Sequence, residues 1–277
     1  MTELIILGNT TPYQMFGALL LCGEKTVVID GGLEEDASQL YDLLKEKGKD
    51  RVDAWFFTHP HHDHLGAFMV FTREHRDVFV ERVYLHFPDR GTLRLCPAHK
   101  AHGGIERQMW EDIWDLLEGE YAQRYTKIQA GDAFSFGEAT LRVLRVWDPE
   151  FDLKKNYVNN SSAVFRLDTP NKRVLFLGDL GVQGGEKLME ALPAEEFYAD
   201  YTQMAHHGQK GVSLAFYDYI KPRRCIWPTP EKIWDNVGED GTGTGKWDTA
   251  ETRRKMAELG VTEHIVEKDG TATLWLD

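Results

Sequence analysis

Four histidines and one aspartate stand within six residues of this chain, in the run His59-Pro60-His61-His62-Asp63-His64. Imidazoles and a carboxylate together suit borderline divalent metals such as zinc, iron and manganese. The run follows an apolar stretch that predicts a buried strand. A loop at the end of such a strand directs His59 and His61 to one ion, and Asp63 and His64 to a second. A His-rich surface turn is the alternative, but packing does not explain so dense a cluster directly after a strand.

Two more places in the sequence offer the remaining ligands of a dinuclear site. Asp179 follows the apolar stretch 173–177, and we predict that it bridges the two ions and orients the nucleophile. The pair His206-His207 follows a third short strand, residues 202–205. One of the pair completes the ligand set of the second ion, and the other is a supporting group, a proton donor or a packed residue. We predict His206 as the ligand and His207, with Asp63 and Asp179, as a catalytic residue.

Composition limits the classes of function. The chain has 277 residues, 42% of them hydrophobic, and a net charge of −13, which argues against a dedicated nucleic-acid surface and favours a small-molecule substrate. No apolar stretch is long enough to span a bilayer, and the N-terminus lacks the pattern of a signal peptide. The three cysteines are far apart and show no Cys-x-x-Cys spacing, so we expect a cytoplasmic protein without disulfides or a thiolate metal site.

The elements that must position these residues alternate in two halves of one domain, residues 1–277. Short apolar runs predict strands, and apolar residues at helical spacing predict helices. Gly23-Glu24-Lys25 predicts a hairpin turn, and Gly260 a helix C-cap. Two β-rich halves, each with helices, indicate an α+β fold, an αβ/βα sandwich with helices outside. The predicted strands are 4–7, 18–22, 26–29, 52–58, 141–147, 163–167, 173–177 and 202–205, and the predicted helices are 34–47, 186–192 and 249–259.

Residues about 90–125 do not fit this alternation, and we interpret them as an insertion. They include a predicted helix with Trp110, Ile113, Trp114 and Leu117 on one face. The stripe favours packing against the core. The alternative is a lid over the site, with His99, His102 or Arg107 in contact with substrate.

The motif His-x-His-x-Asp-His at residues 59–64 resembles that of the metallo-β-lactamase superfamily. Asp30-Gly31-Gly32 is similar to the family's early Asp-x-Gly turn, whose aspartate braces the histidine loop. Asp179 matches the bridging aspartate, and the pair 206–207 the last histidine. The resemblance implies a four-layer αβ/βα sandwich, two divalent ions and hydrolysis by metal-activated water. We expect zinc, with manganese or iron as alternatives.

Within the superfamily the chain is similar to the branch that contains the hydrolase domain of ComEC-type DNA-uptake proteins and the phosphorylcholine esterases. The similar segments are residues 159–162 (Asn-Asn-Ser-Ser), 206–208 (His-His-Gly, followed by Gln209) and 268–270 (Lys-Asp-Gly). Asn160 stands where most members place a third histidine for the first ion, so Asn160 is a candidate ligand or substrate contact. Lys246 stands where the branch often has a His-Pro, and it is a further candidate contact. We interpret the Gly-rich run 241–245 as a loop.

Three classes of function remain open at this point. The branch resemblance favours hydrolysis of a small phosphoester, a phosphodiester before a monoester. The same metal centre serves hydrolysis of a lactone, carboxylic ester, amide or thioester. A non-catalytic metal-binding protein is the third, and it is disfavoured because the ligand set leaves room for water.

Overall fold

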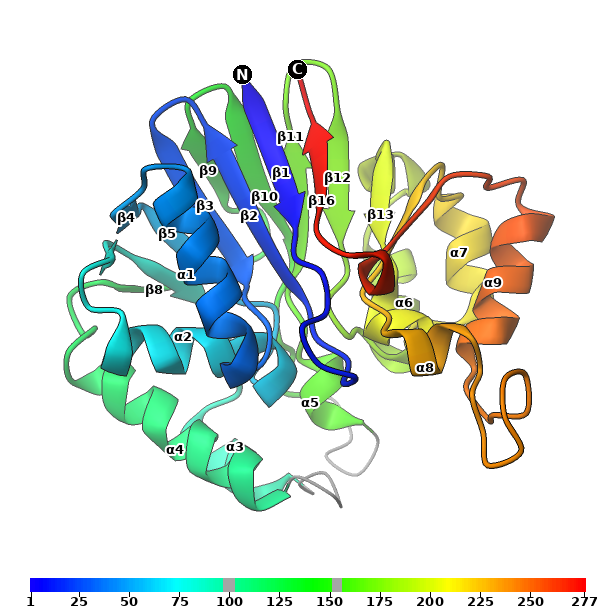
Figure 1. The fold of residues 1–277 in the computed structure, drawn as a ribbon, viewed down its shortest axis with the longest axis horizontal. Helices are drawn as coiled ribbons and strands as arrows, with labels where there is room; N and C mark the ends of the chain where they lie inside the picture. Colours follow the sequence, from blue (N-terminus) through cyan, green and yellow to red (C-terminus); the bar gives the residue numbers. More distant parts are fainter. Residues whose placement is uncertain (97–102, 151–155) are drawn as a thin grey trace.

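The computed structural model describes residues 1–96, 103–150 and 156–277. Within these residues two seven-stranded sheets lie face to face, and helices cover the outer face of each sheet (Figure 1). The predicted αβ/βα sandwich is confirmed. Each sheet has the same plan, four antiparallel strands followed by three that continue in parallel.

The first sheet contains both ends of the chain. Its antiparallel part is formed by hairpins, and Gly23 makes the predicted turn between β2 and β3 with φ +57°. A small separate pair of strands, β4 (Arg51–Val52) and β6 (Phe79–Val80), lies at its edge. In spatial order the strands are β16 (Ala272–Trp275), β1 (Thr2–Ile6), β2 (Gly17–Cys22), β3 (Lys25–Asp30), β5 (Ala54–Phe56), β7 (Val83–Leu85) and β8 (Tyr125–Lys127).

The second sheet is built from the second half of the sequence. Parallel pairing begins between β12 and β13, so the ends of these neighbouring strands meet at one edge. In spatial order the strands are β15 (His264–Val266), β14 (Cys225–Trp227), β13 (Tyr201–Gln203), β12 (Arg173–Phe176), β11 (Val164–Asp168), β10 (Ala139–Arg145) and β9 (Ala133–Phe136).

Helices form the two outer layers (Figure 1). The first sheet is covered by η1 (Glu34–Asp36), α1 (Ala37–Glu46), α2 (His62–Glu74), α3 (Arg90–Leu95) and α4 (Gly103–Glu118). The short α5 (Tyr157–Asn160) precedes β11. The second half adds α6 (Val182–Ala191), η2 (Ala194–Phe197), η3 (Ala205–Gly208), α7 (Leu214–Ile220), α8 (Glu231–Trp234), α9 (Thr249–Glu258) and η4 (Glu267–Asp269).

Burial on both faces of the sheets explains the apolar runs in the sequence. Along β2, Leu19 and Leu21 pack against the helices of the first half, whereas Ala18 and Leu20 pack between the sheets. Side chains alternate across a strand, so a strand buried on both faces is apolar at every position. A third cluster joins the second sheet to α6, α7 and α9.

Two local predictions were wrong. The stretch 52–58 is not one strand, because the chain passes from β4 to β5 at Asp53, whose carboxylate accepts from Thr26 N–H at 2.9 Å and from Lys25 Nζ at 2.7 Å. Residues 62–64 are not loop, because they form the first turn of α2. This helix is buried along most of its length, so its sequence carries little amphipathic period.

No helix in the described part of the chain combines the length and apolar character needed to cross a bilayer.

Candidate metal centre

The histidine run lies between the buried strand β5 and the helix α2. His61, the N-cap of α2, has extended backbone, whereas Asp63 and His64 belong to the first helical turn. This change of backbone conformation directs the two pairs of side chains to different places, as expected from the spacing. Asp63 also lies where the helix dipole favours a negative charge.

Asp30 supports the histidine run through hydrogen bonds, as the family resemblance implies. Its buried carboxylate accepts from the Thr58 N–H, the Thr58 hydroxyl and His64 Nδ1, each at 2.8 Å. His59 Nδ1 lies 3.1 Å from Thr58 Oγ1, whose own proton is directed to Asp30, so His59 Nδ1–H is the donor. Each of the two histidines therefore presents Nε2, with its lone pair, to the interior of the site.

Asp179 comes from the loop after β12, and Gly178 lets this loop approach the histidine run. Gly178 has φ +55°, and a Cβ there would lie 2.8 Å from Thr58 Cβ and 3.0 Å from Ser162 Oγ. The Asp179 N–H donates to Ser162 Oγ at 3.1 Å. His64 Nε2 lies 3.1 Å from Asp179 Oδ1.

His207 completes the group, whereas His206 lies at its margin. His207 Nδ1 donates to Pro228 O at 2.7 Å, and its Nε2 lies 3.2 Å from both Asp63 Oδ2 and Asp179 Oδ2. His206 Nε2 is 4.0 Å from Asp179 Oδ2, and its side chain is 22% exposed. Both residues have φ near +50°, a conformation that is costly for non-glycine residues and is found mostly at functional sites.

Ligand atoms therefore gather in two groups that share Asp179. The first contains His59, His61 and Asp179, and the second contains Asp63, His64, Asp179 and His207, with the ligand atoms of each group within 4.8 Å of one another. The expected division of the histidine run between two ions agrees with this geometry. Of the last two histidines, His207 and not His206, the expected ligand, belongs to a group.

The side chains of both groups fit divalent metal ions. His59 Nε2 and His61 Nδ1 face each other at 3.0 Å. His64 Nε2, Asp179 Oδ1 and His207 Nε2 are buried atoms without a hydrogen bond to the described residues. His64 Nε2 lies 3.1 Å from Asp179 Oδ1, and His207 Nε2 lies 3.2 Å from Asp179 Oδ2. Lone pairs this close repel, and a buried polar atom without a partner is costly, unless a cation lies between them.

The pKa shifts in the second group also indicate a place for a cation. Burial opposes protonation of His64, but Asp179 and Asp30 outweigh it and raise the pKa of this imidazole well above its usual value. Asp179 and Asp63 likewise overcome burial and raise the pKa of His207 to about 10. Against burial, the two imidazoles hold the pKa of Asp63 and of Asp179 well below the usual range. The group therefore favours positive charge among its carboxylates, which protons or a divalent cation supply.

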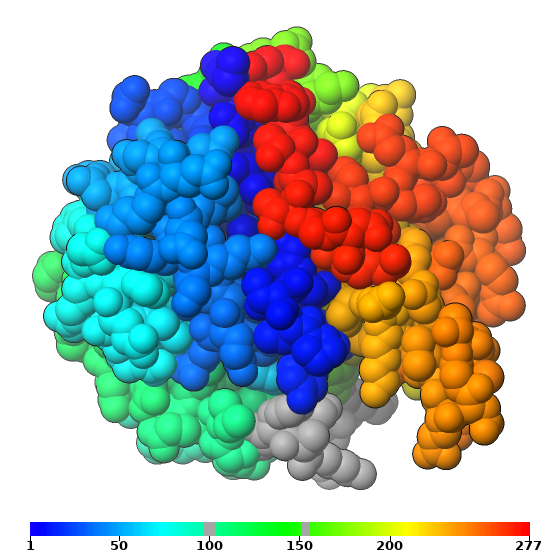
Figure 2. Space-filling view, in the orientation of Figure 1, coloured from blue at the N-terminus to red at the C-terminus, as the bar shows by residue number. Residues whose placement is uncertain are grey.

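Among the described residues, the predicted substrate contacts Asn160, Arg107 and Lys246 do not belong to either ligand group. Asn160 is buried, and its Oδ1 accepts from the Gly184 N–H at 2.9 Å, so it holds the first turn of α6. Arg107 lines a groove between α3 and α4 with Arg90 and Arg94. Lys246 is exposed, on the stretch 236–246 that stands out from the body of the molecule in Figure 2. His99 and His102 lie outside the described residues.

The sequence did not reveal several residues that support the site. Gln203 is fully buried; its Oε1 accepts from Leu177 N–H and Gly178 N–H at 2.8 Å, and its Nε2 donates to Met204 O at 2.7 Å. It thereby joins the ends of β12 and β13, which carry Asp179 and His207. The only available signal was a glutamine at the end of an otherwise apolar strand. Glu106 and Trp110 of α4 reach the histidine run from the other side.

Comparisons with known proteins agree with the fold. Residues 18–154 match the sequence model of the Metallo-beta-lactamase superfamily. A curated relative, the ComE operon protein 3 of Bacillus subtilis (strain 168), is 24% identical over 188 residues, which are 68% of this chain and 21% of that protein. The match thus spans about a fifth of that longer protein.

Solved structures share the fold at low sequence identity. YhfI of Bacillus subtilis, a metallo-beta-lactamase fold protein, has a TM-score of 0.58 and 13% identity, with 99% of this chain and 100% of that chain covered. A diphosphatase of the PhnP family has a TM-score of 0.53 and 12% identity, with 100% and 98% covered. The diiron β-hydroxylase CmlA of Streptomyces venezuelae has a TM-score of 0.57 and 15% identity, with 99% and 54% covered. The chain thus has the metallo-β-lactamase fold, and the sequence match of residues 18–154 is to the superfamily of the same name.

Proposed function

We propose that this protein is a dinuclear metal-dependent hydrolase of a small phosphoester, with a phosphodiester favoured over a monoester. The observation that carries the proposal is the pair of ligand groups joined at Asp179. His59, His61 and Asp179 would hold the first ion, and Asp63, His64, His207 and Asp179 would hold the second. When bound, such ions lower the pKa of water to about 7 and stabilise charge that develops on the reacting oxygens.

The residues of the chain supply orientation. Asp30 and Thr58 fix the ring nitrogens of His59 and His64, and Pro228 fixes that of His207. Orienting groups of this kind set the tautomer and raise the basicity of a ligand. His206 is partly exposed at the edge of the second group, so we assign it the role first given to its neighbour, proton transfer to the leaving group.

The direction toward phosphoesters rests on three lines of support. The sequence resembles the phosphoesterase-containing branch, a fold neighbour is described as a diphosphatase, and two adjacent cations suit in-line displacement at phosphorus. The net charge of −13 disfavours a long nucleic acid, whereas a small phosphoester experiences mainly the local field of the ions. Zinc is the expected metal, and the diiron neighbour makes iron the first alternative to load.

Kinetics on one metal-loaded sample test the proposal. Turnover of bis-p-nitrophenyl phosphate, p-nitrophenyl phosphate and a simple lactone is compared at equal metal content. We expect the diester to have the largest kcat/KM. A lactone preference of several orders of magnitude would overturn the substrate class and leave the metal centre standing.

A further inference from the structure

The insertion helix α4 reaches the metal loop at two points. Trp110 Nε1 donates to the carbonyl of Pro60 at 2.8 Å, and Trp110 is 3% exposed. One turn earlier, Glu106 is equally buried, and its Oε1 lies 3.5 Å from His62 Nδ1. Both contacts are made to residues that alternate with the ligands of the run. The side chains of His59 and His61 face the ion sites, while Pro60 and His62 are in contact with α4.

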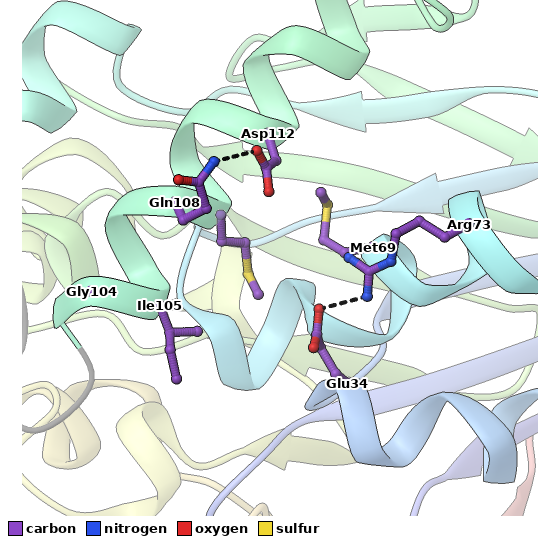
Figure 3. A pocket seen from close by; sticks show the side chains of 8 residues that line it. Glu34, Met69, Arg73, Gly104, Ile105, Gln108 and Asp112 are labelled. Atoms are coloured by element: carbon purple, nitrogen blue, oxygen red, sulfur yellow. Dashed lines mark hydrogen bonds and ion pairs between the residues drawn. The ribbon is translucent and has the colours of Figure 1, made fainter.

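Helix α4 is itself anchored in the core, so its contacts can fix the position of the metal loop. Met109, Ile113 and Leu117 of α4 pack in the core of the first half. Figure 3 shows α4 beside α2, with the Glu34–Arg73 ion pair and the Gln108–Asp112 hydrogen bond at the rim of the groove between them.

Trp110 also connects the two halves of the molecule. Its ring packs with Tyr157 and Val158 of α5, in a cluster separate from the main cores. The same segment continues to Ser162, which holds the Asp179 N–H. Trp110 thus bonds to the segment that carries His59 and His61 and lies in one cluster with the segment that supports Asp179.

The position of Pro60 explains why its hydrogen bond with Trp110 matters for the metal loop. Its carbonyl is buried just before α2 begins, where a carbonyl has no donor within the helix. The indole N–H satisfies this carbonyl and so fixes the Pro60–His61 peptide, which lies between the two histidines of the first group. Asp63 and His64 are held differently, by the first turn of α2 and by Asp30.

We propose that Trp110 and Glu106 are positioning residues for the first metal ion, and that α4 is a brace for the ligand loop. The inference rests on the proposed metal centre. It predicts that loss of the indole N–H weakens metal binding by the three-residue group, which contains His59 and His61. Metal binding by the four-residue group should be weakened less. Groups that orient metal ligands typically contribute about 10- to 100-fold in affinity.

The test compares Trp110→Phe with Trp114→Phe in the full chain. Trp114 lies one turn further along α4, and its Nε1 has no hydrogen-bond partner among the described residues, so its substitution makes the same change from indole to phenyl without removing a hydrogen bond. Zinc affinities are measured for both ions by competition with a chromophoric chelator, together with thermal unfolding of the metal-free proteins. We expect about 10- to 100-fold weaker binding of one zinc ion in Trp110→Phe and near wild-type values in Trp114→Phe.

A second pair, Glu106→Gln and Glu111→Gln, tests the other contact if Trp110→Phe unfolds more easily. Glu111 is a more exposed acid of the same helix, paired with Arg94 at 2.6 Å. We expect the Glu106 variant alone to release one ion early. Equal zinc affinities within each pair would overturn the brace while leaving the metal centre intact. A wild-type chain that binds no zinc would remove the metal centre and this inference with it.

Discussion

Replacing Asp30 by asparagine changes one buried atom and should affect both stability and metal binding. Three donors point at this carboxylate, two of them at Oδ2 and one, the Thr58 N–H, at Oδ1. If the amide NH₂ of the introduced asparagine takes the place of Oδ1, it faces the Thr58 N–H, and a backbone N–H cannot rotate away. Placed at Oδ2, it opposes the Thr58 hydroxyl, which can rotate, and His64 Nδ1–H.

Either placement has a cost of predictable size. A buried donor left without an acceptor costs about 1–3 kcal/mol, which is the expected loss in free energy of unfolding of the metal-free protein. If His64 instead changes tautomer to accept at Nδ1, its Nε2 carries a proton and no longer offers a lone pair to the second ion. A supporting group of this kind contributes about 10- to 100-fold to metal affinity, so tight binding of that ion should be lost.

Denaturant unfolding of the metal-free protein and chelator competition measure the two effects separately. Asp53→Asn is the matched control, because its carboxylate also accepts a backbone N–H, that of Thr26 at 2.9 Å, but lies at β4 and β5 rather than at the site. The control should bind metal as the wild type does. An Asp30→Asn protein with wild-type stability and wild-type affinity for both ions would refute the assignment of donors and acceptors around Asp30.

Other predictions follow from the same geometry. His207→Ala should lose one ion per chain, whereas His206→Ala should keep both and lower kcat, as elemental analysis and turnover together would show; equal metal loss would contradict the exchange of roles. Gly178→Ala should lower the unfolding free energy by about 1–3 kcal/mol, because it combines a left-handed backbone with a Cβ 2.8 Å from Thr58 Cβ; unchanged denaturant midpoints would argue against this. Arg107→Ala should leave kcat/KM within about 2-fold, and a large rise in KM would restore Arg107 as a substrate contact.

Local spacing in the sequence was sufficient to single out most of the side chains that gather in the two groups. The spacing within the run 59–64 predicted two sets of side chains, although the first turn of α2, which helps to separate them, was predicted as a loop. Asp179 could be identified because it ends an apolar strand, and parallel strand ends meet at one edge of a sheet. The duplicated plan of the fold was visible for the same reason, since strands buried on both faces give distinct apolar runs.

The remaining features depend on contacts between distant parts of the chain. The place of His207 in the second group depends on two left-handed residues and on the Pro228 carbonyl, neither of which has a local signal. Asn160 was predicted to face the site because of its place in the sequence, but its side chain is bonded to α6. Trp110 was interpreted as packing, and it does pack, yet its indole N–H reaches across 50 residues to Pro60.

The central claim is that one carboxylate joins two metal sites, and metal stoichiometry tests it most directly. Wild-type protein and Asp179→Ala are reconstituted with zinc, freed of loosely bound metal and analysed for zinc per chain, with circular dichroism as the check on folding. Because Asp179 belongs to both ligand groups, the account predicts about two ions in the wild type and fewer than one in the folded variant. A wild type that holds no metal, or a folded Asp179→Ala that still holds two ions, would contradict it.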